Sequence, residues 1–188
     1  AALKADKCDI YTDVDGVYTT DPRYVKDARK LASISYDEML ELANLGAGVL
    51  HPRAVEFAKN YHVPLEVRSS MKLERGTMIE EEEKMEENLV VRGIAFENQI
   101  TRVSVLGMPR TLSSLSTIFT NLAQSGINVD IIIQSITDKD TVDLSFSIKS
   151  NDLNSTLEVL EKSKPAFKFE DIQYESNLAK VSIVGSGM

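Results

Sequence analysis

The sequence predicts an α/β protein in which part of a layered sheet is followed by a ferredoxin-like βαββαβ module. Short apolar runs alternate with amphipathic segments over residues 1–79, the order expected when helices pack on a sheet. After a run of glutamates the pattern changes to alternating strands that are separated by amphipathic helices. A strand sequence near residue 103 also recurs near residue 181, as a repeated module would produce.

The composition excludes several functional classes. The 188 residues carry a net charge of −8, which argues against nucleic acid or an anionic membrane as a partner. With one cysteine, Cys8, and two histidines, neither a disulfide framework nor a metal site is expected. No apolar run is long enough to span a membrane and no signal peptide is recognisable. We therefore expect a cytoplasmic protein.

The chain begins with a strand that leads into a polar loop. Residues 1–6 resemble the end of a helix and lack an initial Met, so we expect a piece of a longer protein. A strand over 8–12 is followed by the stretch from Thr12 to Arg23, in which Asp15-Gly16 and Asp21-Pro22 are turn dipeptides. In open α/β sheets ligands bind beyond the carboxyl ends of strands. The loop is thus a candidate binding site, with a solvated turn as the alternative.

Helices and a strand complete this first segment. Ser35 and Glu38 have the spacing of a capping box, which predicts a helix that continues to Gly46. A second helix is predicted over 53–61 and a short strand over 63–68, after which Gly76-Thr77 falls in a polar loop. The acidic run that follows is interpreted as a linker and domain boundary.

The second segment has the order of a ferredoxin-like split unit. Strands are predicted over 101–106, 127–134, 142–148 and 167–174, and helices over 112–122 and 153–162. Gly107 begins the turn into the first helix, Gly126 stands where a helix C-cap would, and Asp138 to Asp140 form a turn. Two helices should then cover one face of a four-stranded antiparallel sheet. The repeated strand predicts that a second copy of the module begins near the end of the chain.

Two groups of side chains could bind a small ligand. In the loop, Tyr18 offers a flat ring for a base and Arg23 a fork for phosphate oxygens, while the aspartates suit hydroxyl or amino groups. In the second segment, period-two spacing places Asn128, Asp130 and Gln134 on one strand face. A carboxylate and amides would suit a free amino acid. A packing aromatic and an ordinary solvent-exposed face are the respective alternatives.

With these stretches in hand, the chain resembles the monofunctional aspartate kinases (aspartokinases). Thr12 to Arg23 looks like the nucleotide loop of the amino-acid-kinase (carbamate-kinase-like) fold. More specific are Ser35 to Gly46, Val49 to Glu56, Val67-Arg68-Ser69-Ser70 and the repeated ACT strands. The resemblance implies five parts: 1–79, the C-terminal part of the catalytic domain; 80–89, an acidic linker; 90–100, a strand of a second ACT domain; 101–176, the first ACT domain; and 177–188, the truncated start of the second.

The resemblance implies an activity and an ATP site. The reaction would be phosphoryl transfer from ATP, with Mg²⁺, to the side-chain carboxylate of L-aspartate, giving 4-phospho-L-aspartate for lysine, threonine and methionine synthesis. By position, ATP would contact four residues: Thr12, Asp13, Tyr18 and Arg23. The family often has a lysine at the position of Gly48, so one nucleotide contact is missing. No catalytic residue and no tightly bound cofactor is expected within these residues.

The resemblance also implies regulation by amino acids. The positions that match an inhibitor site for lysine or threonine are Asn128, Val129, Asp130 and Gln134. Such sites lie between ACT domains, so a homo- or hetero-oligomer is expected. Some members of the family also produce the regulatory part separately, and Met85, which follows purine-rich glutamate codons, is a candidate internal start. The alternative function is therefore an amino-acid-binding regulatory subunit without catalysis.

Overall fold

The computed structural model describes residues 2–81, 91–137 and 140–185, which form two compact units. The first unit is Ala1–Glu97 with Val181–Met188, and the second is Asn98–Lys180. Met85, most of the predicted linker and part of the turn predicted at 138–140 lie outside the described residues.

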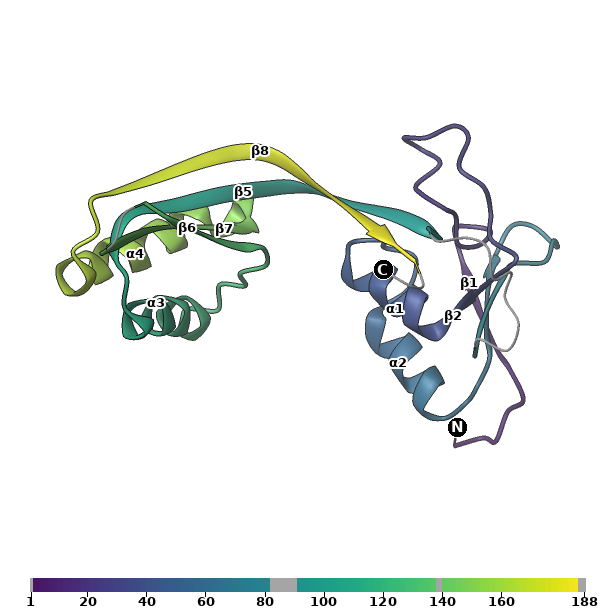
Figure 1. Cartoon of the computed structure of the whole chain (residues 1–188). Coiled ribbons are helices and arrows are strands. Elements are labelled where there is room, and N and C mark those ends of the chain that lie inside the picture. The colour runs from purple at the N-terminus through teal and green to yellow at the C-terminus, as the bar shows by residue number, and fades with distance from the viewer. Residues whose placement is uncertain (1, 82–90, 138–139, 186–188) are drawn as a thin grey trace. The chain divides into compact units, whose positions relative to one another are not determined.

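Among its described residues the first unit has a four-stranded sheet and two helices (Figure 1). The strands are β1 (Cys8–Thr12), β2 (Ser33–Ser35), β3 (Leu65–Ser69) and β4 (Thr77–Glu80), in the order β1-β3-β4-β2. The pairs β1–β3 and β2–β4 are parallel, and β3–β4 is antiparallel. The helices are α1 (Tyr36–Asn44) and α2 (Pro52–Asn60). Their buried residues, among them Met39 and Val55, share one core with Val67 and Ile79 of the sheet.

The predicted capping box begins α1. The side chain of Ser35 accepts a hydrogen bond from the backbone N–H of Glu38 at 3.2 Å, and Oε2 of Glu38 accepts one from the N–H of Ser35 at 3.2 Å. Two of the backbone donors at this helix end are thereby satisfied. The prediction of this helix is confirmed.

Two predictions for the first unit are wrong. Residues 2–6 are not helical, and Thr77, expected in a polar loop, begins β4. Thr77 is fully buried because its hydroxyl accepts from the N–H of Val17 at 2.8 Å and donates to the carbonyl of Leu31 at 2.7 Å. A threonine whose hydrogen bonds are satisfied can occupy a core position.

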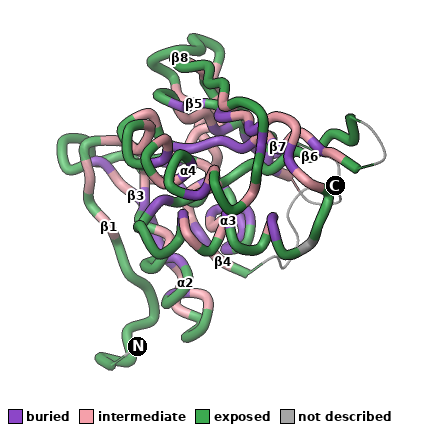
Figure 2. Tube along the Cα trace, turned by 90° about the vertical axis from the view of Figure 1, so that its left-hand side faces the viewer, coloured by how far each residue is buried: buried purple, intermediate pink, exposed green. Residues whose placement is uncertain are grey.

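The second unit has the predicted βαββαβ order. Its elements are β5 (Gly93–Pro109), α3 (Leu112–Gln124), β6 (Ile132–Ile136), β7 (Thr141–Lys149), a 3₁₀ turn (Ser150–Asp152), α4 (Leu153–Phe167) and β8 (Asp171–Val184). The strand order is β6-β7-β5-β8, and β7 is antiparallel to both β5 and β6. Figure 1 shows α3 and α4 on one face of this sheet. In Figure 2 the buried residues follow the central strands, where β7 alternates between half-buried and buried positions.

The helix α3 ends at the predicted glycine. Gly126 has φ +74°, its N–H donates to the carbonyl of Ala123 at 3.0 Å, and the N–H of Ile127 donates to that of Leu122 at 3.0 Å. This pair of bonds is a Schellman motif. The C-cap prediction is confirmed.

The strand predicted over 127–134 is wrong in its first half. Only Ile132–Ile136 is a strand, because the N–H of Ile127 closes the Schellman motif. The N–H groups of Asp130 and Ile131 donate to the carbonyl and hydroxyl of Ser147 at 3.1 and 3.0 Å. Asn128, Asp130 and Gln134 therefore do not share one strand face.

Two other boundaries differ from the prediction. The turn expected at Gly107 is a bulge within β5: the register with β7 shifts between Val105 and Met108, and Gly107 has φ +63°. The helix α4 extends to Phe167 and ends at Lys168, which has φ +50°, so the strand predicted from residue 167 begins at Asp171. Both differences arise from left-handed backbone positions, which end or bend regular elements.

The outer ends of β5 and β8 belong to the first unit. The N–H of Arg92 donates to the carbonyl of Val184 at 2.8 Å, and Ala95 and Val184 are both buried in the core of that unit. The assignment of 90–100 and 177–188 to a second ACT domain stays a prediction.

Candidate functional site

The polar loop begins where two parallel strands end. Thr12 pairs with Ser69 in the β1–β3 register, and its carbonyl accepts from the N–H and hydroxyl of Ser70 at 2.8 and 3.0 Å. The hydroxyl of Thr12 donates to Oδ1 of Asp13 at 2.9 Å. The loops that follow β1 and β3 thus meet at one edge of the sheet, which is the usual position of a ligand site in α/β folds.

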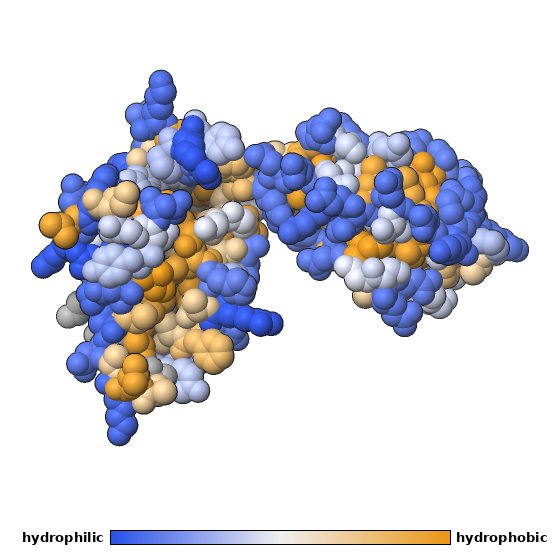
Figure 3. All heavy atoms as spheres, turned by 180° about the vertical axis from the view of Figure 1, so that it is seen from behind, coloured by the Kyte–Doolittle hydropathy of each residue, from blue (hydrophilic) through white to orange (hydrophobic). Residues whose placement is uncertain are grey.

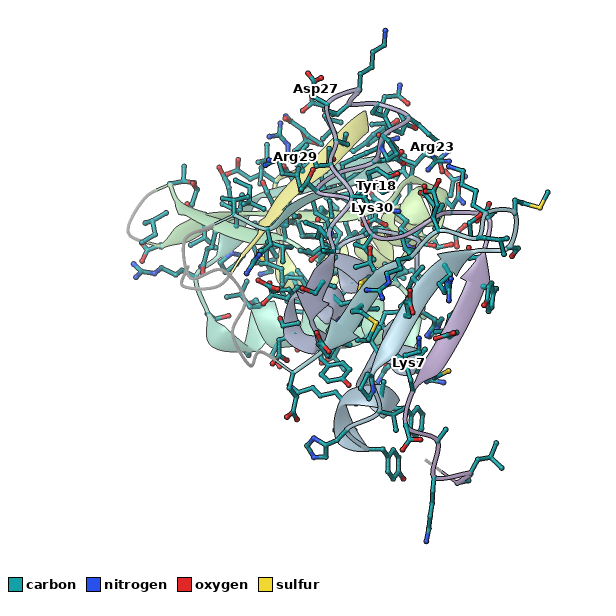
Figure 4. All side chains as sticks on the ribbon, turned by 90° about the vertical axis from the view of Figure 1, so that its right-hand side faces the viewer. Lys7, Tyr18, Arg23, Asp27, Arg29 and Lys30 are labelled. Carbon is teal, nitrogen blue, oxygen red and sulfur yellow. The ribbon has the colours of Figure 1, made fainter. Side chains whose placement is uncertain are left out.

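Residues 17–19 and 29–31 form a two-stranded arm that presents Tyr18. The N–H of Leu31 donates to the carbonyl of Val17 at 2.8 Å, and the N–H of Thr19 to that of Arg29 at 2.9 Å. Figure 4 labels Tyr18, Arg29 and Lys30 on this arm and Arg23 in the turn between its two segments, whereas Lys7 lies at the start of β1. The arm thus gathers an aromatic ring and several cations in one region.

A glycine fixes the base of this arm. Gly16 has φ +153°, and a Cβ there would lie 2.6 Å from Oγ1 of Thr77. The next residue, Val17, is buried and donates its N–H to the same oxygen at 2.8 Å. Only glycine allows this close approach, so the arm leaves the core at a defined place.

The ring of Tyr18 is held by its hydroxyl. This group donates to Oδ1 of Asp15 at 3.0 Å, and Nζ of Lys72 donates to Oδ2 at 3.2 Å. Burial alone would raise the pKa of Asp15, but these hydrogen bonds outweigh it and hold that pKa below its ordinary value. Burial, followed by the bond to Asp15, raises the pKa of Tyr18. At neutral pH a tyrosine hydroxyl therefore donates to a carboxylate.

Arg23 is paired within the loop. Its Nε lies 3.0 Å from each carboxylate oxygen of Asp21, and Nη2 lies 2.6 Å from Oδ2. The hydrogen bonds from Arg23 are the main cause of the lowered pKa of Asp21. The Arg23 side chain is 83% exposed, so a ligand oxygen can reach the guanidinium without displacing a core contact.

The four predicted ATP-site residues therefore occupy one polar loop. Thr12 and Asp13 stand at the end of β1, Tyr18 on the arm and Arg23 in the turn beyond it. Sequence reasoning missed Lys72, which lies 57 residues from its partner Asp15. Because Lys72 follows the strand parallel to β1, it would be a candidate once that pairing is assumed.

Gly48 lies in open space. A Cβ at this position would have no heavy atom within 4 Å, and the residue is exposed. A side chain is sterically acceptable where the family often has a lysine.

The predicted effector residues surround the start of β6. Asn128 and Asp130 are exposed and precede the strand, Val129 packs against the core of the second unit, and Gln134 pairs with Leu144. The Asp130 carboxylate forms an ion pair with Nζ of Lys180, a contact that sequence reasoning missed. An acid that already binds an ammonium group is suited to amino-acid recognition.

Among residues 2–81, 91–137 and 140–185, no group of three or more His, Cys, Asp or Glu side chains is placed to hold a metal ion. Within the same residues no helix is long and apolar enough to cross a membrane.

Two family models and several known proteins are similar to this chain. The amino acid kinase family model matches residues 1–69 and an ACT domain model matches 103–163. An aspartokinase of Bacillus sp. (strain MGA3) is 74% identical over 188 residues, which are 100% of this chain and 46% of that protein. The chain thus spans about half the length of the curated relatives it matches.

Solved structures of an aspartokinase are also similar to this chain. E. coli aspartokinase III in complex with aspartate and ADP (R-state) has a TM-score of 0.78 and 30% identity, over 98% of this chain and 41% of that one. The same protein in complex with lysine and aspartate (T-state) also has a TM-score of 0.78 and 30% identity, over 98% and 40%. These matches confirm the predicted fold class, and the whole of this chain is similar to part of the aspartokinases.

Proposed function

We propose that these residues form part of an aspartate kinase, which transfers the γ-phosphoryl group of ATP to the side-chain carboxylate of L-aspartate. The product is 4-phospho-L-aspartate. The observation that carries the proposal is the loop after β1, which begins at the carboxyl ends of two parallel strands and contains Tyr18 and Arg23. It stands in a chain 74% identical to an aspartokinase. The related E. coli structure holds aspartate and ADP.

In this proposal the loop binds the nucleotide by positioning it. The ring of Tyr18 stacks on the base, and the hydrogen bond to Asp15 fixes its orientation. Arg23 offers its exposed fork to phosphate oxygens, and Thr12 and Asp13 provide hydroxyl and carboxylate groups for the ribose side. Phosphoryl transfer depends mainly on positioning and charge stabilisation. None of these residues is assigned a chemical step.

Mg²⁺ enters the proposal with the nucleotide. The described residues provide no cluster of acidic or histidine ligands, and the carboxylate of Asp15 is already bound by Tyr18 and Lys72. They do not fit a separate magnesium site. In kinases the ion keeps several waters and is held largely by substrate phosphates, so it would arrive with ATP and need no ligand from these residues.

The second unit provides the regulatory part of the proposal. The E. coli relative is known in complex with lysine, and we assign lysine or threonine to Asn128, Val129, Asp130 and Gln134. The edge strand β6 exposes apolar side chains beside this site, including Ile132 at 51% and Ile133 at 57%. An apolar edge strand favours pairing with another chain, which supports a homo- or hetero-oligomer through ACT domains.

Other features of the surface fit the same proposal. Figure 3 shows hydrophobic residues gathered on one face of the first unit, and apolar side chains exposed in that unit include Met71 and Leu73. Large exposed apolar areas mark contacts with other protein parts. Cys8 is free and exposed, which suits the reducing cytoplasm. The net charge of −8 argues against nucleic acid as a partner.

The experiment uses a protein of the relatives' full length that contains these residues. ADP release is measured with L-aspartate or L-glutamate, and the acyl phosphate is trapped with hydroxylamine. We expect ADP and hydroxamate to form in equal amounts with aspartate and at background level with glutamate. ADP release without hydroxamate would contradict the assignment, because no carboxylate would then have been phosphorylated.

A regulatory subunit without catalysis is the second candidate. It is favoured by the separate core of the second unit, which joins both helices to the sheet. An internal start at Met85, which lies outside the described residues, would produce such a subunit. Met85→Leu should remove a shorter product on a blot made with an antibody against the second unit. Persistence of that product would exclude Met85 as its start.

A further inference from the structure

The first residues of β5 lie against the arm that presents Tyr18. The N–H of Ile94 donates to the carbonyl of Thr19 at 2.7 Å, and the N–H of Thr19 donates to the carbonyl of Arg29 at 2.9 Å. The hydroxyl of Thr19 also accepts from the N–H of Arg29 at 3.1 Å. Thr19, next to Tyr18, is therefore hydrogen-bonded on both sides, twice to Arg29 within the arm and once to β5.

An aromatic contact joins β5 to the turn that carries Arg23. The rings of Tyr24 and Phe96 have centroids 4.5 Å apart and planes at 84°, the favourable edge-to-face geometry. The N–H of Tyr24 donates to the carbonyl of Asp21 at 3.1 Å, so this ring belongs to the turn that also pairs Asp21 with Arg23. Phe96 thus supports the turn from outside the loop.

The same residues of β5 are fixed to the core of the first unit. Nε of Arg92 lies 3.3 Å from Oε1 of Glu38, with both side chains at most 8% exposed. A Cβ on Gly93 would lie 3.0 Å from Cδ2 of Leu42, and Ala95 is 3% exposed. Arg92 and Gly93 therefore pack on α1, while Ile94 and Phe96 contact the loop.

We infer that the start of β5, with Phe96 and Ile94 as its contacts, positions the nucleotide loop. The inference rests on the proposed function, which assigns this loop to ATP. Phe96 is a positioning residue, because it acts through Tyr24 and does not contact the nucleotide. Since β5 runs from Gly93 to Pro109 and enters the second unit, the strand that opens the regulatory fold also holds the ATP loop.

The test compares variants in a protein of the relatives' full length. Phe96→Ala and Tyr24→Ala should each raise KM for ATP by about three- to tenfold. KM for aspartate and kcat should stay within about twofold of the unchanged protein. Tyr24→Phe keeps the ring and should restore the original KM. The double variant should have a KM for ATP no higher than that of either single variant, because both substitutions remove the same contact.

A matched control is available on α2. Phe57 also makes one aromatic contact, to Tyr61 at 6.4 Å, and is 63% exposed. Phe57→Ala therefore removes a ring pair from the same unit without touching the loop. Hydrogen exchange of peptides covering residues 17–31 should accelerate in Phe96→Ala and not in Phe57→Ala.

The outcomes separate this inference from the proposed function. An unchanged KM for ATP in Phe96→Ala and Tyr24→Ala would overturn the inference, as would an equal effect in Phe57→Ala. If the unchanged protein shows no aspartate-dependent turnover, the proposed function fails. Weaker ADP binding by calorimetry, together with faster exchange of 17–31 in Phe96→Ala, would still support the positioning role.

Discussion

Arg92 and Glu38 form a buried ion pair between the residue before β5 and the first turn of α1. Nε of Arg92 lies 3.3 Å from Oε1 of Glu38, and the side chains are 8% and 7% exposed. Oε2 of the same glutamate accepts from the N–H and hydroxyl of Ser35 at 3.2 and 3.0 Å. One carboxylate therefore caps a helix and also holds the segment that leads into the second unit.

Removing one member of this pair should destabilise the first unit. Glu38→Ala leaves a buried guanidinium without this carboxylate and breaks the capping box, so the free energy of unfolding should fall by about 3–5 kcal/mol. Urea denaturation followed by circular dichroism measures the loss. Glu41→Ala, an exposed position of the same helix, is the control and should change stability by less than about 0.5 kcal/mol. A similar loss in both variants would contradict the role of the pair.

Tyr18 should contribute to ATP binding through its ring. Its hydroxyl is already bound to Asp15, so Tyr18→Phe should raise KM for ATP by less than about threefold. Tyr18→Ala removes the stacking surface and should raise it by about tenfold or more. Steady-state kinetics at saturating aspartate provides the measurement. If both substitutions raised KM for ATP equally, the hydroxyl would be the binding group and this interpretation would be wrong.

Gly48→Lys should strengthen nucleotide binding. The position is exposed and a Cβ there meets no heavy atom within 4 Å, so the substitution is expected to fold normally. A lysine in this place would add a charged hydrogen bond to a phosphate, which should lower KM for ATP by about fivefold. Gly48→Gln, which has a long neutral side chain, is the control and should leave KM near its original value. An unchanged KM in Gly48→Lys would show that this position does not reach the nucleotide.

Because of Glu66, the stability of the chain should depend on pH in the acidic range. The hydrogen bond from Lys7 at 2.6 Å, followed by that from the N–H of Gly76 at 3.0 Å, lowers the pKa of Glu66 below 4.5. A carboxyl with a lowered folded pKa stabilises fully above its unfolded pKa, and the contribution disappears as pH falls through the folded value. Glu66→Gln should therefore reduce stability by about 1 kcal/mol at pH 7. Urea titrations should show that the difference in unfolding free energy between the unchanged protein and Glu66→Gln becomes smaller below pH 4.5. A difference that is the same at all pH values would contradict this prediction.

Local and periodic features of this fold could be predicted from the sequence. The capping box of Ser35 and Glu38 involves residues three apart, and the Gly126 cap is fixed by its own helix. The alternation along β7 reflects a strand whose buried side chains, such as Leu144 and Phe146, recur every second residue. Such signals need no knowledge of distant partners.

Features that depend on distant partners could not be predicted. Thr77 is buried because its hydroxyl binds Val17, 60 residues away. Lys72 reaches Asp15 across 57 residues, and only the parallel pairing of β1 with β3 brings their loops together. The strand predicted from Ile127 starts too early, because the N–H groups of Asp130 and Ile131 bind the carbonyl and hydroxyl of Ser147 ahead of β6. A hydrophobic pattern alone does not show where along it the strand pairing begins.

The pair of Asp130 and Lys180 should compete with an amino-acid effector. The Lys180 side chain is 10% exposed and forms an ion pair with Asp130. In the effector site that we propose, its ammonium would therefore compete with the ammonium of the effector. Asp130→Asn should raise the half-inhibitory lysine concentration about tenfold or more. Lys180→Met keeps the apolar stem and frees the carboxylate, so it should lower that concentration. Inhibition by lysine is measured by ADP release. Asp171→Asn, which alters an exposed acid of β8, is the control and should leave that concentration unchanged. Because competition predicts opposite shifts in the two variants, a shift in the same direction would place the effector elsewhere in the second unit.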